Sequence, residues 1–276
     1  MVDIVISVAC YNNEDEIIAF AEQLSHQRIS ENLCLLVSCN SCSSSSDLEK
    51  KLNDVSVQTA VYNPKVNLGY LHGCLYGLSE YSRENEYDWA MISNTDLIFE
   101  KDSFFEKFSK GINDEDIWCV GPDITLKTTG AHQNPFLILP PSNRMINTWR
   151  FAYSNPVTFN LYFWLAGVKS RLKKANNEIL DSKFVYAVHG SCFLLRKECI
   201  EKIIEVKDEI FMYEEELLVA EVTKANGKKV FFDNNLSVVH NENQVTGTIN
   251  NAKKHKWFKD SFYFLYKNFY SNMLKG

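Results

Sequence analysis

The first 125 residues alternate between short apolar runs and amphipathic segments, and this order limits the fold more than any other feature. The apolar runs have the length and composition of strands that are buried on both faces. They are Ile4–Ala9, Leu33–Ser38, Gln58–Tyr62 and Trp89–Ser93. Helical spacing occurs between them, in Glu14–Leu24, in a polar stretch from about Asp47 and in Leu71–Tyr81. Strands that alternate with helices form mostly parallel sheets, so the sequence predicts an α/β domain.

The alternation stops between about Gly130 and Asp181, where four of the six prolines lie. Long irregular segments in compact domains are usually functional loops or mobile lids, and we expect this role for residues 130–181. Beyond the irregular segment, the alternation returns. The predicted elements there are a strand at Ser191–Leu195, helices at Lys197–Ile204 and Glu215–Ala225, and short strands at Lys229–Phe232 and Ser237–His240.

Composition limits the class of protein. The 276 residues are 45% apolar, which is enough for a sizeable core without a metal or disulfide. A net charge of −6 argues against broad nucleic-acid binding. The beginning of the chain lacks the basic region of a signal peptide, so we expect a cytoplasmic protein whose eight cysteines are reduced thiols. The longest apolar run, Phe159–Val168, is about half the ~20 residues needed to span a bilayer.

Polar, small and turn-forming residues follow each of the four predicted strands. These segments are Cys10–Asn13, Cys39–Cys42, Asn63-Pro64 with Asn67–Gly69, and Asn94–Asp96. Ligands of open α/β sheets bind beyond the carboxyl ends of the strands. The sequence therefore predicts a ligand site at this edge of the sheet.

Asn94-Thr95-Asp96 is the most specific of these segments. Residues i and i+2 of an extended chain point the same way, so Asn94 and Asp96 can face one cation. Oxygen ligands of this kind, completed by phosphates, suit Mg²⁺ or Mn²⁺. The alternative is an Asx turn that closes the strand.

Several segments, taken in order, resemble the family-2 glycosyltransferases of the GT-A fold, of the bacterial surface-polysaccharide, rhamnosyltransferase-like type. The resemblance covers about residues 3–125 and 185–242. It rests on VACYNNEDEI, VSCNSCSSSSD, NLGYLHGCLYGL, MISNTDLIF, HGSCFLLRKECIEKI and FMYEEELLVAEVTKANGKKVFFDNNLSVVH. Each motif alone is weak, and the specificity comes from six motifs in the family's order.

The resemblance implies one GT-A domain over residues 1–250, with a single mostly parallel sheet. Residues 1–125 would form a Rossmann-like half that binds the nucleotide-sugar. Residues 126–250 would form the acceptor half, including the irregular insert. Residues 251–276 would add a basic, aromatic C-terminal helix.

The resemblance also implies roles for single residues. Asp96 would bind a Mn²⁺ or Mg²⁺ ion that bridges the donor's diphosphate, and His240 would contact the metal or the diphosphate. The alternative for His240 is a histidine satisfied within the core. Other residues would line the nucleotide-sugar site: Ala9, Tyr11, Asn12, Asn40, Asn67, Gly69, Asn94, Thr95, Gly190 and Ser191.

The pair Cys39-Asn40 departs from the family, which usually has Asp-Asn after the second strand. A thiol is a poor acceptor for the N–H of a pyrimidine base. Asn40 or a backbone carbonyl would then read the base, and the identity of the base stays open. The spacing Cys39-x-x-Cys42 also permits redox or zinc chemistry, but no second pair with that spacing completes a zinc site.

Glu214, Glu215 and Glu216 begin the predicted helix at Glu215–Ala225. One explanation for the three glutamates is structural, because the helix dipole favours carboxylates at a helix N-terminus. Glycosyl transfer also needs a base that deprotonates the acceptor hydroxyl. In the resemblance Glu216 takes the place of the family's Asp and Glu215 that of the preceding Glu, so one of the two would be the base.

These features predict an inverting transfer of a sugar from a UDP- or dTDP-sugar to a saccharide acceptor, in O-antigen or capsule synthesis. One alternative is a sugar nucleotidyltransferase, although Ala9–Asn13 lacks the glycine and basic residues of its triphosphate loop. The other is a non-catalytic protein of the same fold that binds nucleotide-sugars.

The last 26 residues mix aromatic residues with six lysines and one aspartate. Trp257, Ser261, Leu265 and Phe269 or Tyr270 fall on one helical face. Such a mixture is typical of an interfacial helix, and it predicts peripheral contact with the inner face of the plasma membrane and a lipid-linked acceptor. The alternative is a helix that packs its aromatic residues on the domain.

Overall fold

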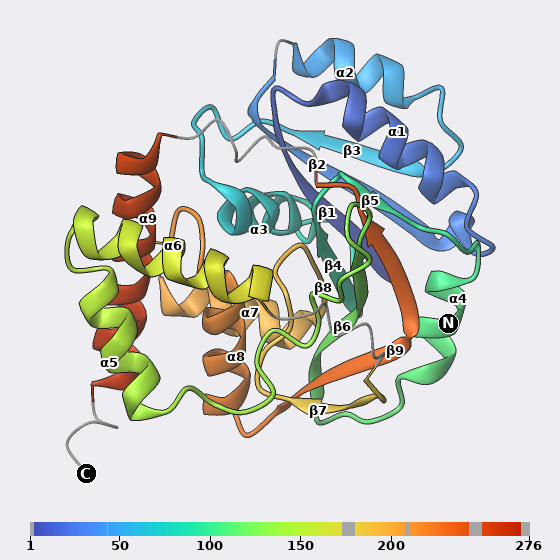
Figure 1. Cartoon of the computed structure of the whole chain (residues 1–276). Coiled ribbons are helices and arrows are strands. Elements are labelled where there is room, and N and C mark those ends of the chain that lie inside the picture. Colours follow the sequence, from blue (N-terminus) through green and yellow to red (C-terminus); the bar gives the residue numbers. More distant parts are fainter. Residues whose placement is uncertain (1–2, 43, 173–179, 208–209, 243–249, 272–276) are drawn as a thin grey trace.

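In the part of the chain that the computed structural model describes, one nine-stranded sheet has the order β3-β2-β1-β4-β8-β6-β9-β5, with β7 paired to β9 (Figure 1). The described residues are 3–42, 44–172, 180–207, 210–242 and 250–271. Four parallel strands form the first half: β1 (Ile4–Tyr11), β2 (Leu33–Ser41), β3 (Gln58–Tyr62) and β4 (Trp89–Ser93). The predicted α/β class with a mostly parallel sheet is confirmed.

Three helices connect these strands at the predicted places: α1 (Glu14–Ser25), α2 (Ser45–Leu52) and α3 (Tyr70–Tyr81). Helix α1 buries Ile17, Phe20 and Leu24, which are three and four residues apart and therefore lie on one face. Helix α2 begins where the Ser44 hydroxyl accepts a hydrogen bond from the Asp47 N–H.

Strand β8 (Cys192–Arg196) joins the two halves, because it pairs antiparallel with both β4 and β6. The remaining strands are β5 (Leu97–Ile98), β6 (Ile117–Leu126), β7 (Lys183–Val185) and β9 (Lys229–His240). The two short strands predicted over residues 229–240 are wrong, since β9 is one strand. Its register against the parallel strand β6 shifts between Pro122 and Asp123. The polar residues Asp233–Asn235 lie at this shift, and they interrupt the apolar pattern of the sequence.

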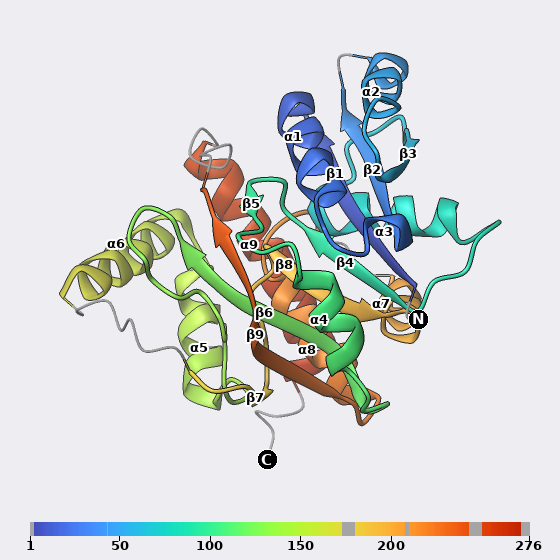
Figure 2. The same cartoon turned by 90° about the vertical axis from the view of Figure 1, so that its right-hand side faces the viewer.

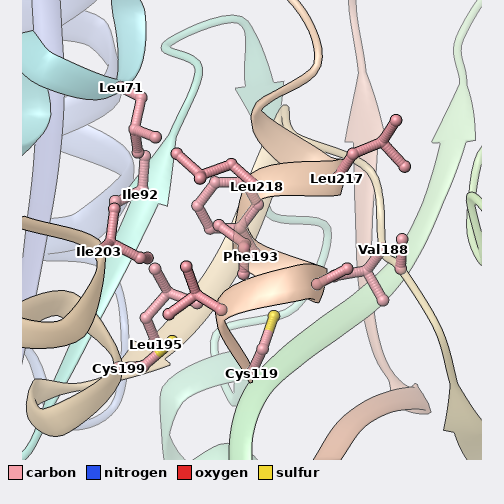
Figure 3. Close-up of a cluster of buried hydrophobic side chains, with 14 of the residues drawn as sticks. Leu71, Ile92, Cys119, Val188, Phe193, Leu195, Cys199, Ile203, Leu217 and Leu218 are labelled. Carbon is pink, nitrogen blue, oxygen red and sulfur yellow. The ribbon is translucent and has the colours of Figure 1, made fainter. Parts of the chain in front are cut away.

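The helices pack in two layers, one on each face of the sheet. Helices α1, α2 and α4 (Phe104–Gly111) cover one face. Helices α3, α7 (Lys197–Val206) and α8 (Glu215–Ala225) cover the other, where Leu71, Ile203 and Leu218 meet Phe193 and other side chains of β4 and β8 (Figure 3). In Figure 2 the two layers lie on either side of the twisted sheet.

The expectation of an irregular segment at 130–181 is wrong for much of its described part, which holds helices α5 (Asn143–Ala152) and α6 (Pro156–Leu172). Helix α6 escaped prediction because Pro156–Val168 is apolar on nearly every side and shows no 3.6-residue alternation. None of the helices in the described ranges is long and apolar enough to cross a membrane.

The tail forms α9 (Asn251–Leu265) and a short π-helix (Tyr266–Tyr270). Ser261, Leu265 and Tyr270, which belong to the face predicted to be interfacial, are fully buried. The tail is therefore a helix packed on the domain, and that face is not available to a membrane. Ser261 donates to the Met212 carbonyl at 3.1 Å, and the Tyr270 hydroxyl lies 3.2 Å from that of Tyr186. The neighbouring Phe258 and Phe262 pack on the aromatic rings of Phe159 and Tyr153.

Candidate functional site

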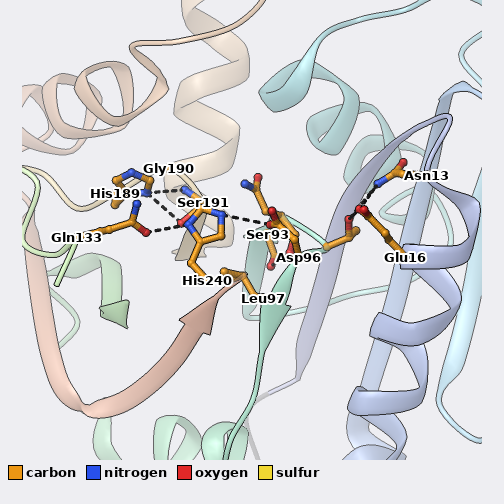
Figure 4. A network of polar contacts seen from close by, with 12 residues as sticks. Asn13, Glu16, Ser93, Asp96, Leu97, Gln133, His189, Gly190, Ser191 and His240 are labelled. Carbon is orange, nitrogen blue, oxygen red and sulfur yellow. Dashed lines mark hydrogen bonds and ion pairs between the residues drawn. The ribbon is translucent and has the colours of Figure 1, made fainter. Parts of the chain in front are cut away.

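The end of β9 and the loop after β4 bring Asp96 and His240 together (Figure 4). Oδ1 of Asp96 lies 3.2 Å from Nε2 of His240, and both side chains are about nine-tenths buried. The His240 Nδ1–H donates to Oε1 of Gln133 at 2.8 Å. That bond fixes the imidazole so that Nε2 faces the carboxylate, in the manner of an outer partner of a metal-ligating histidine.

Thr95 points the other way and ties the same loop to the start of α1. Its hydroxyl donates to Oε2 of Glu16 at 3.2 Å and accepts from Nδ2 of Asn13 at 3.0 Å. Asn13 and Glu16 lie at the start of α1. Thr95 and Asp96 lie in a turn, in which Thr95 contacts the start of α1 and Asp96 contacts His240 of β9.

A third set of contacts joins the loop after β4 to α8. The Asn94 N–H donates to the carbonyl of Ser191 at 2.8 Å. The neighbouring Gly190 N–H donates to Oε1 of Glu216 at 3.1 Å. A Cβ on Gly190 would lie 2.9 Å from that oxygen, so glycine is what allows the carboxylate to approach the backbone. Asp96, Ser191 and Glu216 therefore share one edge of the sheet.

The three glutamates at the start of α8 differ in burial. Glu214 and Glu215 are buried, whereas Glu216 is partly exposed. Burial, followed by the negative charge of Glu216, raises the pKa of both Glu214 and Glu215 to about 8. Oε1 of Glu215 accepts from the Tyr213 N–H at 2.9 Å, so its carboxylate turns back on the chain.

Two consecutive residues before α8 have left-handed backbone, Tyr213 with φ 70° and Glu214 with φ 68°. Non-glycine residues rarely adopt this conformation, and each costs about 1–3 kcal/mol. Contacts hold it in place: the Tyr213 ring stacks on Phe258 at 4.1 Å, and the Tyr153 hydroxyl bonds Glu214. This strained turn lies directly before α8, and it therefore sets the direction in which the Glu216 side chain points.

Asn40, at the end of β2, is buried and holds the segment before α3. Its Nδ2 donates to the Gly69 carbonyl at 2.6 Å, and its Oδ1 accepts from the Leu68 N–H at 3.3 Å. Asn67 Oδ1 accepts from the Gly69 N–H at 2.9 Å. Gly69 has φ +80°, and a Cβ there would lie 1.9 Å from the Phe211 carbonyl oxygen. The amide of Asn40 thus positions this segment.

The end of β1 forms the remaining wall. Asn12 has φ 56°, its N–H donates to the Ser41 carbonyl at 2.8 Å, and its Oδ1 accepts from the Ser41 hydroxyl at 2.9 Å. Tyr11 is half exposed beside it, and Ala9 is partly buried against α3. These residues place the ends of β1 and β2 next to each other, as the parallel pairing requires.

Cys39 and Cys42 form a disulfide, with Cα atoms 5.4 Å apart. The expectation that all eight cysteines are reduced thiols is therefore wrong for this pair; the other six are free and buried. The chain turns after β2, which brings the two Cα atoms within disulfide range. Asn40, a residue of the predicted site, lies inside this small ring together with Ser41.

Three residues of the site were not predicted from the sequence: Gln133, Asn134 and His189. Asn134 is buried, accepts from the His189 N–H at 2.6 Å and donates to the Pro122 carbonyl at 2.7 Å. His189 Nδ1 lies 2.9 Å from the Ser191 hydroxyl, and burial lowers its pKa. Two features of the sequence indicate these residues: the dipeptide Asn134-Pro135, and the position of His189 directly before Gly190.

Asp96 and His240 offer one carboxylate and one imidazole to a cation. Within the described ranges, no cluster of three or more His, Cys, Asp or Glu side chains could hold a metal. Two protein ligands suit Mg²⁺ or Mn²⁺ only where a ligand's phosphate oxygens complete the shell. The donor set therefore fits a cation that arrives with a diphosphate.

Comparison with solved structures identifies the architecture. The mannosyltransferase from Pyrobaculum calidifontis, solved in complex with GDP-Man and Mn²⁺, superposes with a TM-score of 0.54 at 12% identity. The match covers 88% of this chain and 58% of that chain, so the present chain spans less than two thirds of its length. The chain has the GT-A fold.

A second GT-A structure is less similar. Glucosyl-3-phosphoglycerate synthase from Mycobacterium tuberculosis, in complex with Mn²⁺, UDP-glucose and phosphoglyceric acid, has a TM-score of 0.46 at 12% identity. That match covers 96% of this chain and 79% of that chain. No protein-family model matches the sequence, and no curated protein matches it.

Proposed function

We propose that this chain is a glycosyltransferase that moves a sugar from a nucleoside-diphosphate donor to a hydroxyl of a saccharide acceptor. The observation that carries the proposal is that Asp96, His240 and Glu216 come from three distant segments and share one sheet edge of a GT-A fold. The Asp96–His240 pair suits a diphosphate-bound cation, and Glu216 offers a partly exposed carboxylate next to Gly190.

The donor's nucleoside would lie at the ends of β1 and β2, against Ala9, Tyr11 and Asn12. A UDP- or dTDP-sugar is the donor that the sequence resemblance favours. The Asn40 amide is already hydrogen-bonded to Leu68 and Gly69, so a backbone group would form the hydrogen bond to the nucleobase. The donor's sugar and diphosphate would lie along Asn67, Gly69 and Asn94, which these contacts hold in place.

Asp96 and His240 would hold Mn²⁺ or Mg²⁺. When bound, such an ion neutralises negative charge on a departing nucleoside diphosphate. Gln133 would orient His240 through its 2.8 Å hydrogen bond to Nδ1. Gly190 and Ser191 would form the wall between the metal ligands and Glu216, the general base.

Glu216 is the base we favour over Glu215, because it is the more exposed of the two and Glu215 bonds back to Tyr213. Its carboxylate would take the proton of the acceptor hydroxyl. The acceptor oxygen then bonds to the anomeric carbon as the bond from that carbon to the diphosphate oxygen breaks. A single displacement of this kind inverts the anomeric configuration.

The acceptor would be a growing bacterial polysaccharide of the O-antigen or capsule type, lipid-linked in some members, and the enzyme would be rhamnosyltransferase-like. This part of the proposal rests on the sequence resemblance alone. The acceptor half, residues 126–250, would supply the surface on which that glycan lies.

Release of free nucleoside diphosphate from a panel of UDP-, dTDP- and GDP-sugars, with and without Mn²⁺, tests the proposal. A glycosyltransferase releases diphosphate from one donor in the presence of an acceptor or water. A nucleotidyltransferase would instead form a nucleotide-sugar and pyrophosphate from a nucleoside triphosphate and a sugar phosphate. A non-catalytic binding protein would bind a donor without releasing product.

A further inference from the structure

Helix α6 presents an uncovered apolar face. Val157 is 77% exposed, Trp164 64% and Leu165 52%, and Leu161 lies between them at 51%. In chain order, Val157, Leu161, Trp164 and Leu165 are four, three and one residues apart, so they form one stripe along the helix. Phe151, at the end of α5, adds another apolar side chain that is 68% exposed.

The opposite face of α6 is also apolar and packs on the protein. Phe159 is buried and contacts Tyr153 and Phe258, while Phe163 contacts Phe258 at 5.3 Å between ring centroids. A helix that is apolar on all sides is covered on all sides in its working state. The uncovered stripe therefore requires an occupant.

Helices α5, α6 and α9 lie together on the side of the molecule away from α1 and α2 (Figures 1 and 2). The stretch of sequence that holds α5 and α6 is basic in an otherwise acidic chain, because residues 124–177 contain no Asp or Glu. The lysines and arginines of that stretch are Lys127, Arg144, Arg150, Lys169, Arg171, Lys173 and Lys174.

Basic side chains also lie beside the stripe in the described structure. Arg144 is exposed on α5, two turns before Phe151 on the same helical face. Arg150, which directly precedes Phe151 on α5, is exposed as well. Apolar and aromatic side chains flanked by cations are the composition of a surface that enters the headgroup region of an anionic bilayer.

We propose that the α5–α6 face, defined by Phe151, Val157, Leu161, Trp164 and Leu165, docks on an anionic lipid surface. The helix lies in the interface with its stripe among the acyl chains, and the surrounding cations meet the lipid headgroups. A second copy of the chain is the other possible occupant. A symmetric dimer through this face would set two basic stretches against each other, which repel.

Co-sedimentation of the full chain with vesicles tests this docking. Phosphatidylcholine vesicles with phosphatidylglycerol should bind the protein, pure phosphatidylcholine vesicles should bind it weakly, and added salt should release it. The double variant Trp164→Ser/Leu165→Ser should lower the partition constant by roughly tenfold or more. The matched control is Ile204→Ser, which removes an apolar side chain 43% exposed on helix α7.

The replaced side chains are exposed, so both variants should keep the wild-type near-ultraviolet circular dichroism. Failure of the full chain to bind anionic vesicles at low salt overturns the proposal, as does equal binding by the double variant. A dimer in light scattering that the double variant abolishes, without vesicle binding, assigns the face to a second copy instead. None of these outcomes depends on glycosyl transfer, so they test the surface independently of the proposed activity.

Discussion

Oδ1 of Asp96 lies 3.2 Å from Nε2 of His240, and the two residues lie at β5 and β9, neighbouring strands at one end of the sheet: Asp96 directly precedes β5, and His240 ends β9. The two-residue strand β5 sets this distance, because Leu97 pairs with His240 in antiparallel register. The Asn241 N–H closes the ladder on the Asp96 carbonyl at 2.9 Å. A short pairing therefore holds the two ligands that would bind a cation.

Asp96→Ala should abolish donor turnover and sharply weaken Mn²⁺-dependent nucleotide binding while the fold survives. The carboxylate lies at a strand end and its loss leaves the backbone bonds of β5 intact. Calorimetry of UDP, dTDP and GDP binding, with and without Mn²⁺, measures the effect. Wild-type binding that is equally strong without metal would contradict the assignment.

Glu216→Gln should keep donor affinity and lower the transfer rate by ~10²–10⁴-fold, since the amide has nearly the same shape and accepts no proton. The same substitution at Glu215 is the comparison. We expect Glu215→Gln to be the milder change, because its oxygen bonds the Tyr213 N–H and faces the chain. A dead Glu215→Gln beside an active Glu216→Gln would exchange the two roles.

Stability should fall as pH rises from about 4.5 to about 8. The pKa of Glu214 is raised from 4.5 to about 8, chiefly by burial. In that window the folded protein holds a proton that the unfolded chain releases, so rising pH favours unfolding. Glu214→Gln should therefore flatten the dependence of Tm on pH across this range.

The control for that experiment is Glu106→Gln. Lys110 lowers the pKa of Glu106, so this carboxyl is already ionised throughout the window. Its replacement should leave the slope of Tm against pH unchanged. An unaltered slope in Glu214→Gln as well would mean that Glu214 titrates normally in the folded protein.

Gly69→Ala and Gly130→Ala form a matched pair that tests the segment proposed to lie against the donor. Both glycines have positive φ, but a Cβ at Gly130 meets nothing within 4 Å, whereas one at Gly69 meets the Phe211 carbonyl oxygen at 1.9 Å. Gly130→Ala should cost about 1–2 kcal/mol of backbone strain. Gly69→Ala should cost about 1–3 kcal/mol more in urea unfolding.

The excess cost arises because the Phe211 carbonyl also accepts from the Tyr70 N–H at 3.2 Å, and it cannot move without weakening that bond. Gly69→Ala should also weaken donor binding in the same calorimetric assay. Equal unfolding free energies for the two variants would show that the segment before α3 shifts freely.

The disulfide predicts a thiol count. Denatured protein that has never met reductant should react with dithionitrobenzoate at six thiols, and reduced protein at eight. Cys42→Ser should give seven thiols without reductant, because Cys39 loses its partner. Eight thiols in the untreated wild type would place both cysteines of the pair in the reduced state.

The sequence by itself determined the strands and helices of the first half. Gln58–Tyr62 and Trp89–Ser93 were predicted at their observed bounds, because buried strands and amphipathic helices have different local periods. The same periods located Asn94–Asp96 at a strand end, and therefore at the edge where the site lies. Helix α6 carried no such signal, since a helix that is apolar all round shows no period.

Only the tertiary structure decided which residues meet at that edge. The Asp96–His240 distance depends on the register of β5 against β9, and the difference between Glu215 and Glu216 depends on the strained turn at Tyr213. The pairing of Cys39 with Cys42 and the contact of Gln133 with His240 likewise arise from how the chain turns. Local patterns specify what an element is, whereas register and burial are set by the whole core packing together, so no stretch of sequence contains them alone.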